Sequence, residues 1–312
     1  MGKASRTKVD TSRREKIAAQ RAAARRAQQR NRILIASGAI VAVIAVVVAF
    51  IVVKANTKHP TASSSTSVSN GPTGSALAGV VSKVTSVSAS TLNSVGNGGG
   101  AVTAIPRPIT GGTALTANGK PEMLYMGAEY CPYCAAERWA MIVALSRFGT
   151  FSGLHTVHSS STDVYANTPT WSFYKSTYTS QYLTFTPVEL TTNVPDASSP
   201  SGYVTLQTPT AAQSAIQAKY DAPPYVASAD AGSIPFIDFG NKYMIAGASY
   251  NPQVLSGLSW AQVAADLSNP SSAVAKGVDG TANYITAAIC KMTGNQPASA
   301  CTSTVQSMEA NL

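Results

Sequence analysis

The chain has 312 residues and a formal net charge of +9, and 45% of its residues are hydrophobic. The charge is concentrated at the start, because residues 1–32 hold 11 Lys and Arg against 2 Asp and Glu. The residues after this basic arm carry no net charge, which excludes a protein that is basic throughout. The arm interleaves Arg with Ala and Gln and has no aromatic residue, so binding of nucleic acid is the less favoured role for it.

Residues 33–53 follow the arm as a run of 21 residues without a charge. A helix of that length covers roughly 30 Å, the thickness of a bilayer core. The positive-inside rule then predicts a single-pass cell-membrane protein, with the arm in the cytoplasm and residues 54–312 outside. A cleaved signal peptide is the alternative. The apolar run is longer than the usual run of about 7–15 residues, which favours an uncleaved anchor.

A flexible linker is predicted over residues 54–114, because its first part is rich in Ser, Thr, Gly and Pro. Val80, Val84 and Leu92 belong to an apolar series with helical spacing, which predicts a short amphipathic helix within the linker. The main domain is expected over residues 115–270 and begins with a strand at 121–127.

Cys131-Pro132-Tyr133-Cys134 lies between this apolar strand and a strong helix-forming run. That order places the first thiol at a helix N-terminus, where free backbone N–H groups and the helix dipole favour an anion. The thiolate is the reactive form of cysteine, so Cys131 is the predicted nucleophile. Cys134 lies one turn later and can close a disulfide with it, which suits reversible thiol–disulfide exchange.

Two other chemistries use the same cysteine spacing. A structural zinc site needs four ligands. The remaining cysteines lie far away in the sequence, and the nearest histidines are His155 and His158, so neither a metal nor another cofactor is predicted. An inert structural disulfide is the second alternative. Pro132 argues against it, because proline suits the first turn of a helix, where its missing N–H costs nothing.

The rest of the main domain is predicted from apolar periodicity and capping residues. The expected elements are strands at 154–158 and 182–190, a helix from Pro209 to Tyr220 with Thr208 as its N-cap, a hairpin at 234–246 and a helix at 260–267.

Residues 271–312 are expected to form a C-terminal helical extension with a helix at about 282–292. Cys290 and Cys301 flank a turn in this extension, which predicts a structural disulfide on the outer side of the membrane, where such bonds persist. A second redox pair that passes electrons to Cys131 is the alternative.

The order of these elements resembles the thioredoxin fold. Residues 127–131 are similar to the segment that precedes the first cysteine in thioredoxins, and Pro132-Tyr133 is the dipeptide of glutaredoxins and some disulfide isomerases. Ile234-Pro235 matches the cis-proline of that superfamily. The resemblance implies an α/β protein, a thioredoxin-like mixed sheet flanked by helices, with an insertion at about 155–232. The wider chain resembles an uncharacterised family of membrane-anchored thioredoxin-like proteins, catalogued only as a domain of unknown function.

The sequence departs from the thioredoxin pattern in two places. Tyr125 stands where thioredoxins often hold a buried acid, and Glu129 is a weak substitute for that acid. The gap between Cys134 and Pro235 is long, and the predicted insertion within it is rich in aromatic residues. A core of the insertion is favoured over a substrate groove for these seven residues: Tyr165, Trp171, Phe173, Tyr174, Tyr178, Tyr182 and Phe185.

Together, the motif and the resemblance predict a membrane-tethered, extracytoplasmic thiol–disulfide oxidoreductase that acts on protein or peptide thiols and disulfides. Cys134 would resolve the mixed disulfide formed by Cys131, and a membrane redox partner is possible. The resemblance implies that Pro235 shapes the site and that the substrate contacts Tyr130, Pro132, Tyr133 and the backbone of Ile234. The alternatives are a non-catalytic binding module, a copper-delivery protein, and a structural domain whose cysteine pair never cycles.

Overall fold

A computed structural model describes residue 67 and residues 69–312 of the chain. The predicted basic arm, the predicted membrane helix and most of the predicted flexible tether lie outside the described residues. Within the part that is described, no helix is both long enough and apolar enough to cross a bilayer.

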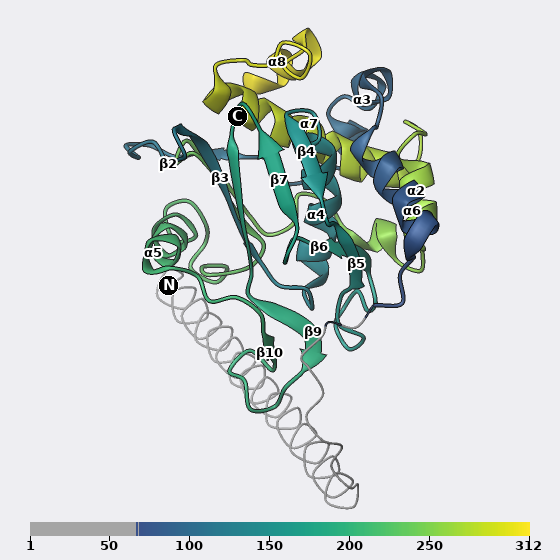
Figure 1. Cartoon of the computed structure of the whole chain (residues 1–312). Coiled ribbons are helices and arrows are strands. Elements are labelled where there is room, and N and C mark those ends of the chain that lie inside the picture. Colours follow the sequence, from purple (N-terminus) through teal and green to yellow (C-terminus); the bar gives the residue numbers. More distant parts are fainter. Residues whose placement is uncertain (1–66, 68) are drawn as a thin grey trace, which may run out of the picture. The chain divides into compact units, whose positions relative to one another are not determined.

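The described residues form a mixed α/β structure (Figure 1). Its α-helices are α2 (Gly74–Thr85), α3 (Ala89–Val95), α4 (Pro132–Leu145), α5 (Ala211–Tyr220), α6 (Trp260–Asp266), α7 (Ala273–Thr293) and α8 (Ser303–Glu309), and two 3-10 helices are η1 (Gly98–Gly100) and η2 (Pro252–Leu255). Its strands are β1 (Arg107–Pro108), β2 (Thr116–Ala117), β3 (Lys120–Gly127), β4 (Gly149–Ser152), β5 (His155–His158), β6 (Pro169–Ser172), β7 (Thr177–Ser180), β8 (Thr184–Glu189), β9 (Thr191–Pro195), β10 (Tyr203–Thr205), β11 (Phe236–Phe239) and β12 (Tyr243–Ala246).

The central sheet is mixed and is built around β3. β8 runs parallel to β3, with Phe185 opposite Met123, and β2 pairs with the first residues of β3. β11 pairs antiparallel with β3, and β12 and β1 follow in the same antiparallel sense. The order β8–β3–β11–β12–β1 puts the strand that leads into the cysteine pair inside the sheet.

Both faces of this sheet are covered. Side chains of a strand alternate between its faces, and those of β3 follow this rule. Met123 and Tyr125 belong to the larger core, which α4 and α7 help to form. Leu124 and Met126 belong to a smaller core together with Tyr220 of α5. Figure 1 shows α4 and α7 on one side of the sheet and α5 on the other.

The segment before residue 115 differs from the predicted linker. α2 and α3 pack on the domain through buried residues that include Val84 and Leu92, and β1 forms an edge of the central sheet. Asn283 Nδ2 donates hydrogen bonds of 2.8 Å to the carbonyl oxygens of Leu92 and Gly96. The domain therefore begins well before residue 115. Helical spacing predicted the buried face of α2, but it could not show which surface covers that face.

The C-terminal region also differs from the predicted extension, because α7 begins at Ala273 and lies in the core against α4. Ser272 caps this helix by accepting a hydrogen bond from the N–H of Ala275. α5 starts two residues later than predicted. Its N-cap is Thr210 and not the predicted Thr208. Thr210 forms a capping box with Gln213, and these two reciprocal hydrogen bonds fix the start of the helix.

Candidate functional site

The cysteine pair lies at the point where β3 ends and α4 begins. Cys131 is the N-cap of α4, and Pro132 occupies the first helical position, as predicted. The Sγ atom of Cys131 accepts a hydrogen bond of 3.2 Å from the backbone N–H of Cys134. A sulfur atom thus takes the place of the oxygen that usually caps a helix, and it satisfies one of the free N–H groups there.

Both thiols are free, and both are buried from solvent, with Cys131 5% exposed and Cys134 not exposed. Burial opposes ionisation of Cys131, but the thiol and N–H of Cys134, the positive charge of Arg138 and the N–H of Tyr133 outweigh it and lower the pKa of Cys131. Burial raises the pKa of Cys134 well above its usual value, and the hydrogen bond with Cys131 adds to this effect. The first cysteine is therefore the one poised to be a thiolate.

The predicted proline lies next to this pair. The Ile234–Pro235 peptide bond is cis, as the sequence analysis expects. The carbonyl oxygen of Ile234 lies 3.7 Å from the Sγ atom of Cys131 and accepts its S–H. β11 starts directly after Pro235 and pairs antiparallel with the end of β3, with Phe236 opposite Met126. This pairing brings Ile234 close to Cys131.

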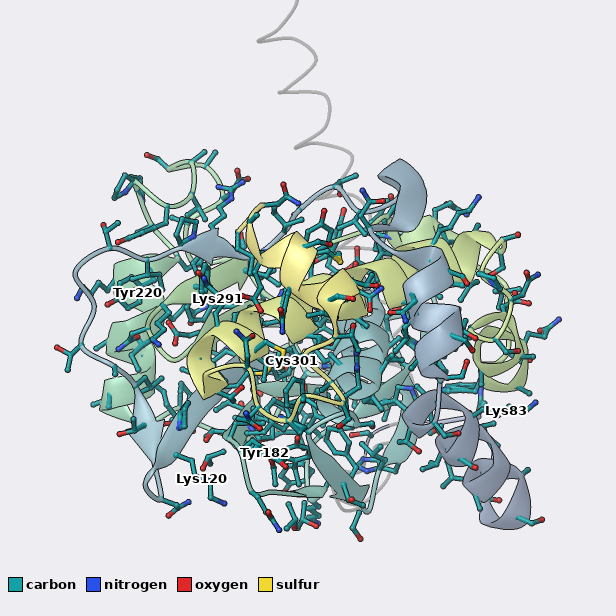
Figure 2. The ribbon with its side chains drawn as sticks, turned by 90° about the horizontal axis from the view of Figure 1, so that it is seen from above. Lys83, Lys120, Tyr182, Tyr220, Lys291 and Cys301 are labelled. Carbon is teal, nitrogen blue, oxygen red and sulfur yellow. A yellow bond between two sulfur atoms is a disulfide. The ribbon has the colours of Figure 1, made fainter. Side chains whose placement is uncertain are left out.

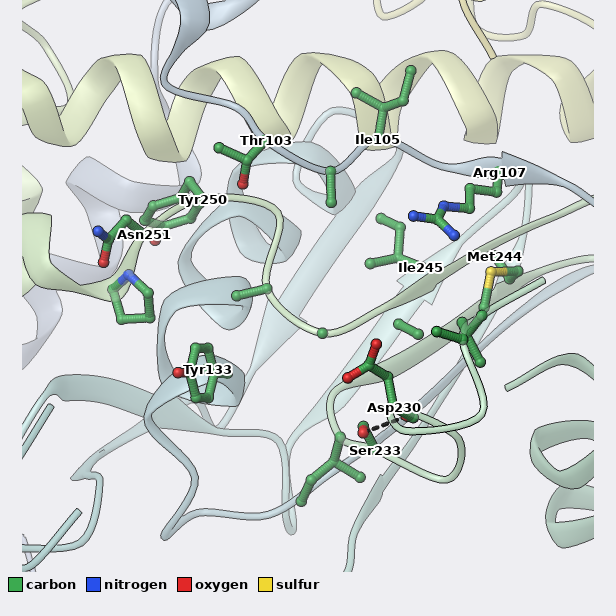
Figure 3. A pocket seen from close by; sticks show the side chains of 18 of the residues that line it. Thr103, Ile105, Arg107, Tyr133, Asp230, Ser233, Met244, Ile245, Tyr250 and Asn251 are labelled. Atoms are coloured by element: carbon green, nitrogen blue, oxygen red, sulfur yellow. Dashed lines mark hydrogen bonds between the residues drawn. The ribbon is translucent and has the colours of Figure 1, made fainter. Parts of the chain in front are cut away.

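A groove of about 730 Å³ opens beside the cysteine pair. Tyr133 and Ile234, which are near neighbours of the cysteines, are among its lining residues. Figure 3 shows Arg107 across the groove from Tyr133. Tyr133 is 41% exposed, and its ring meets Tyr165 edge to face with centroids 5.8 Å apart. The other lining residues come mainly from residues 103–105, 226–233 and 244–252.

The predicted substrate-binding residues separate into two groups. Tyr133 and Ile234 line the groove, whereas Tyr130 and Pro132 are not among its lining residues. Pro132 is buried, and the ring of Tyr130 stacks on Tyr203 with centroids 4.1 Å apart. Burial, with the nearby cysteines, raises the pKa of the Tyr130 phenol to about 12.

Most aromatic residues of the predicted insertion lie in or against the larger core that α4 and α7 help to form. The predicted separate core of the insertion is therefore wrong, because β8 pairs with β3 and joins these residues to the core of the domain. Phe185 contacts Phe173 and Tyr178, all three contact Phe151, and Phe173 also meets Tyr125 of β3. Tyr174 lies outside this core, and so does Tyr165, which lines the groove. The sequence offered no periodicity that separates it from the others, since it lies in a turn region between β5 and β6.

A buried ion pair that no sequence pattern predicted lies behind the cysteines. Arg138 of α4 and Glu189 of β8 are both fully buried, and they form two parallel hydrogen bonds of 2.9 Å and 2.6 Å. Glu189 Oε1 also accepts the N–H of Phe173. Arg138 stands four residues after Cys134, which places both on one face of the helix. That spacing could have indicated Arg138, but no local pattern indicates Glu189.

Two further buried polar residues, Tyr125 and Glu129, lie near the ion pair of Arg138 and Glu189. Tyr125 is fully buried, its hydroxyl has no hydrogen-bond partner among the described residues, and its ring lies 5.7 Å from the guanidinium carbon of Arg138. Burial raises the pKa of Tyr125 well above its usual value. Burial also raises the pKa of Glu129, against the influence of nearby Ser172 and Ser67 hydroxyls. The charged form of Glu129 is thus disfavoured, and its suggested role as a substitute acid stays a prediction.

The other cysteines form the predicted disulfide between Cys290 and Cys301, with Cα atoms 5.8 Å apart. Figure 2 shows Cys301 in the C-terminal region, close to α8. His155 and His158 lie on β5, and no group of three or more His, Cys, Asp or Glu residues within the described part of the chain could hold a metal ion.

Fold and site together define an α/β protein with a dithiol at a helix N-terminus beside a groove. A family model described as "Domain of unknown function (DUF929)" matches residues 110–291, more than half of the chain. The chain belongs to this family, which confirms the expected membership of a domain of unknown function. Neither the comparison with curated proteins nor that with solved structures finds a match.

Proposed function

We propose that this protein is a thioredoxin-like thiol–disulfide oxidoreductase that acts on disulfides or thiols of proteins and peptides. One observation carries the proposal: the Cys131 thiol caps α4, accepts the N–H of Cys134 at 3.2 Å and faces the carbonyl of Ile234 at 3.7 Å. A thiolate in that position is stabilised by the helix terminus, while its partner stays protonated.

The reaction follows from the different pKa values of the two cysteines. The Cys131 thiolate attacks one sulfur of a substrate disulfide, so that a mixed disulfide forms and the other substrate sulfur leaves as a thiolate. Cys134 gives its proton to that leaving group and attacks Cys131. The Cys131–Cys134 bond then forms, and the second substrate sulfur leaves. Two electrons pass from the pair to the substrate, and every step can run in reverse.

The sheet order supports the thioredoxin-like assignment. The strand before the cysteines has a parallel neighbour on one side, β8, and an antiparallel neighbour on the other, β11. Pro235 directly precedes β11, which sets the Ile234–Pro235 bond against the N-terminus of α4. This is the arrangement that the resemblance in the sequence implies.

The groove supports an extended peptide as substrate. It combines aromatic rings, such as Tyr133 and Tyr165, with apolar side chains such as Ile105, and its volume is that of a small-ligand or peptide-side-chain site. A substrate chain lying in it would pass Ile234, whose backbone is next to Cys131. Main-chain contacts there would hold the scissile disulfide without demanding one sequence.

Trapping of mixed disulfides tests this function. In the purified full chain, Cys134→Ser should accumulate a covalent complex with a disulfide-containing peptide, because Cys131 can attack but nothing resolves the product. Cys131→Ser is the matched control and should trap none, since Cys134 is fully buried with a raised pKa. Equal trapping by both variants would refute the roles. Stoichiometric binding of Cu(I) by the reduced wild type, without turnover, would favour copper delivery instead.

We also propose that the domain acts outside the cytoplasm on a membrane tether. The support is the basic arm of residues 1–32 and the uncharged run of residues 33–53. A reporter enzyme that works only outside the cytoplasm should be active when fused after Leu312. The same reporter should be inactive when fused before residue 33. Cytoplasmic activity of the C-terminal fusion would overturn the topology.

A further inference from the structure

The electrostatic surroundings of the cysteine pair bear on the direction of electron flow. Arg138 lies one turn beyond Cys134 and two turns beyond Cys131 on the same face of α4. Its side chain has no exposure to solvent. Arginine keeps its charge in proteins, so a full positive charge stays behind the thiols at every pH at which the protein is folded.

Glu189 holds this charge in place. The guanidinium donates through Nε and Nη2 to the two carboxylate oxygens, at 2.9 Å and 2.6 Å. Its remaining nitrogen, Nη1, has no hydrogen-bond partner among the described residues. The guanidinium is therefore anchored on one side by the carboxylate and has a donor group left over in the interior. A bidentate pair of this kind fixes orientation as well as charge.

Burial favours the neutral form of three other titratable groups near the thiols. Tyr125 packs against Arg138 and is neutral, because burial raises its pKa well above the usual value. Burial likewise favours the neutral forms of Glu129 and Tyr130. Of the two members of the ion pair, Arg138 is the one that stands on the helix that carries the cysteines.

We propose that Arg138, held by Glu189, is a positioning residue that stabilises the thiolate of the reduced pair and thereby makes the oxidised pair a disulfide donor. This inference rests on the proposed exchange reaction and adds its direction. A cation in a low-dielectric interior acts strongly on a nearby thiolate. Whatever stabilises the reduced form of a dithiol makes the corresponding disulfide a stronger oxidant.

The favoured step then oxidises the substrate. A substrate thiolate attacks Cys131 Sγ and forms a mixed disulfide, while the Cys131–Cys134 bond breaks and its electron pair leaves on Cys134, which takes up a proton. A second substrate thiolate attacks the substrate sulfur of the mixed disulfide and expels Cys131 as a thiolate. The substrate loses two electrons and the pair gains two. A small disulfide, such as oxidised glutathione, restores the pair by the reverse exchange.

The experiment replaces the ion pair as a unit, because removal of one partner would leave a buried charge uncompensated and endanger the fold. In the full chain, Arg138→Met with Glu189→Leu removes both charges and keeps similar volumes. Arg138→Gln with Glu189→Gln is a second neutral pair, in case the first does not fold. Arg138→Lys retains the charge. Glu137→Gln is the matched control, since Glu137 is another buried ionisable residue on α4, but it accepts hydrogen bonds from Ser249 and takes no part in the ion pair.

Two readouts are measured on each folded variant. The Cys131 pKa is followed by thiolate absorbance and by the pH dependence of alkylation, and neither needs exchange to occur. The equilibrium constant with reduced and oxidised glutathione gives the oxidising strength. The neutral pair should raise the Cys131 pKa by about one unit or more. It should also make the disulfide roughly tenfold or more less oxidising, whereas Arg138→Lys should stay within about threefold of wild type.

Each outcome decides the inference. An unchanged Cys131 pKa in the neutral pair would overturn it, even if the wild type exchanges disulfides normally. A raised pKa with wild-type oxidising strength would overturn the assigned direction. If the wild type itself does not exchange with glutathione, the proposed function fails, while the pKa readout still tests whether Arg138 stabilises the thiolate. A shift of the same size in Glu137→Gln would show that loss of any buried ionisable group on α4 changes the Cys131 pKa, and would also count against Arg138.

Discussion

The two cysteine pairs of this chain are similarly buried but lie in different surroundings. Cys131 and Cys134 are free thiols on the first turn of α4, where backbone N–H groups, a guanidinium and a groove meet. Cys290 and Cys301 are joined across the end of α7, and both belong to the large hydrophobic core. Burial alone therefore does not tell a reactive pair from a structural one.

The difference lies in what each sulfur atom can do when its bond opens. At the first pair, a thiolate would find hydrogen-bond donors and a positive charge, and Tyr133 and Ile234 line the neighbouring groove. At the second pair, a thiolate would be left inside the large hydrophobic core, to which both cysteines belong. Reduction is thus accommodated at one end of the domain and resisted at the other.

The largest expected effect comes from breaking the structural pair. Cys290→Ala with Cys301→Ala should lower the free energy of unfolding by about 3 kcal/mol, because a loop closed by a disulfide loses entropy in the unfolded chain. Urea unfolding measures this loss. The alkylation rate of Cys131 should not change. As a control, Cys131→Ala with Cys134→Ala should abolish thiol–disulfide exchange. Its free energy of unfolding should stay within about 1 kcal/mol of that of the wild type in which only Cys131 and Cys134 are reduced. Loss of exchange in the first variant would instead support an electron relay between the pairs.

A glycine beside the reactive pair gives the next effect. A Cβ atom on Gly127 would collide with the hydroxyl and ring of Tyr125, whose side chain folds back over that residue. Gly127→Ala should therefore cost about 2 kcal/mol of stability. The added cost should largely disappear in a Tyr125→Leu background. Gly79→Ala is the control, because its Cβ would meet nothing within 4 Å, and it should be neutral or slightly stabilising. Thermal unfolding compares all four variants.

Stability should also depend on pH through the helix that carries Cys290. Asp279 of α7 is fully buried, neither carboxylate oxygen has a hydrogen-bond partner among the described residues, and burial raises its pKa from 3.8 to about 8. The folded state therefore holds a proton that the unfolded state releases, and stability falls as pH rises from about 4 to 8. Glu137 and Asp238, each with a pKa raised to about 7 by burial, act in the same direction.

Asp279→Asn removes one of these titrations. The variant should gain roughly 1–2 kcal/mol over wild type at pH 8 and almost nothing at pH 4. Urea unfolding at both pH values measures the difference. A variant whose advantage is equal at both pH values would show that Asp279 does not titrate as described. Thiol–disulfide exchange at Cys131 should be unaffected, which would show that it is independent of the titration of Asp279.

The smallest effect is expected in the groove. Tyr133→Ala removes a half-exposed ring that contacts Tyr165. It should lower kcat/KM for a disulfide-containing peptide roughly fivefold, the scale of one modest binding contact. The rate with a small aromatic disulfide reagent should stay the same. Val164→Ala is the control, since Val164 is 67% exposed and is not among the groove-lining residues. Equal losses with both substrates would mean that Tyr133 acts on the thiols and not on peptide binding.

Local sequence was sufficient for the elements that carry the reactive pair. The apolar run before Cys131, the helix formers after Cys134 and Pro132 between them predicted strand, N-cap and helix, because all these preferences act within one turn of the chain. The hairpin at 234–246 and the Cys290–Cys301 bond were predicted on equally local grounds. Boundaries were less certain: Thr210 displaced Thr208 as the cap of α5 through a side-chain pair with Gln213.

Only the tertiary structure decided the contacts between distant parts of the chain. Arg138 meets Glu189 because β8 pairs in parallel with β3 and ends beneath α4, a register that no periodicity in either segment reveals. The groove likewise needs Tyr133, Tyr165 and residues 103–105, which approach only when the sheet is complete. The sequence by itself determined that the Cys131 thiol stands at the N-terminus of a helix, because helix capping is local. Its charge environment and access depend on burial, and burial is a property of the whole fold.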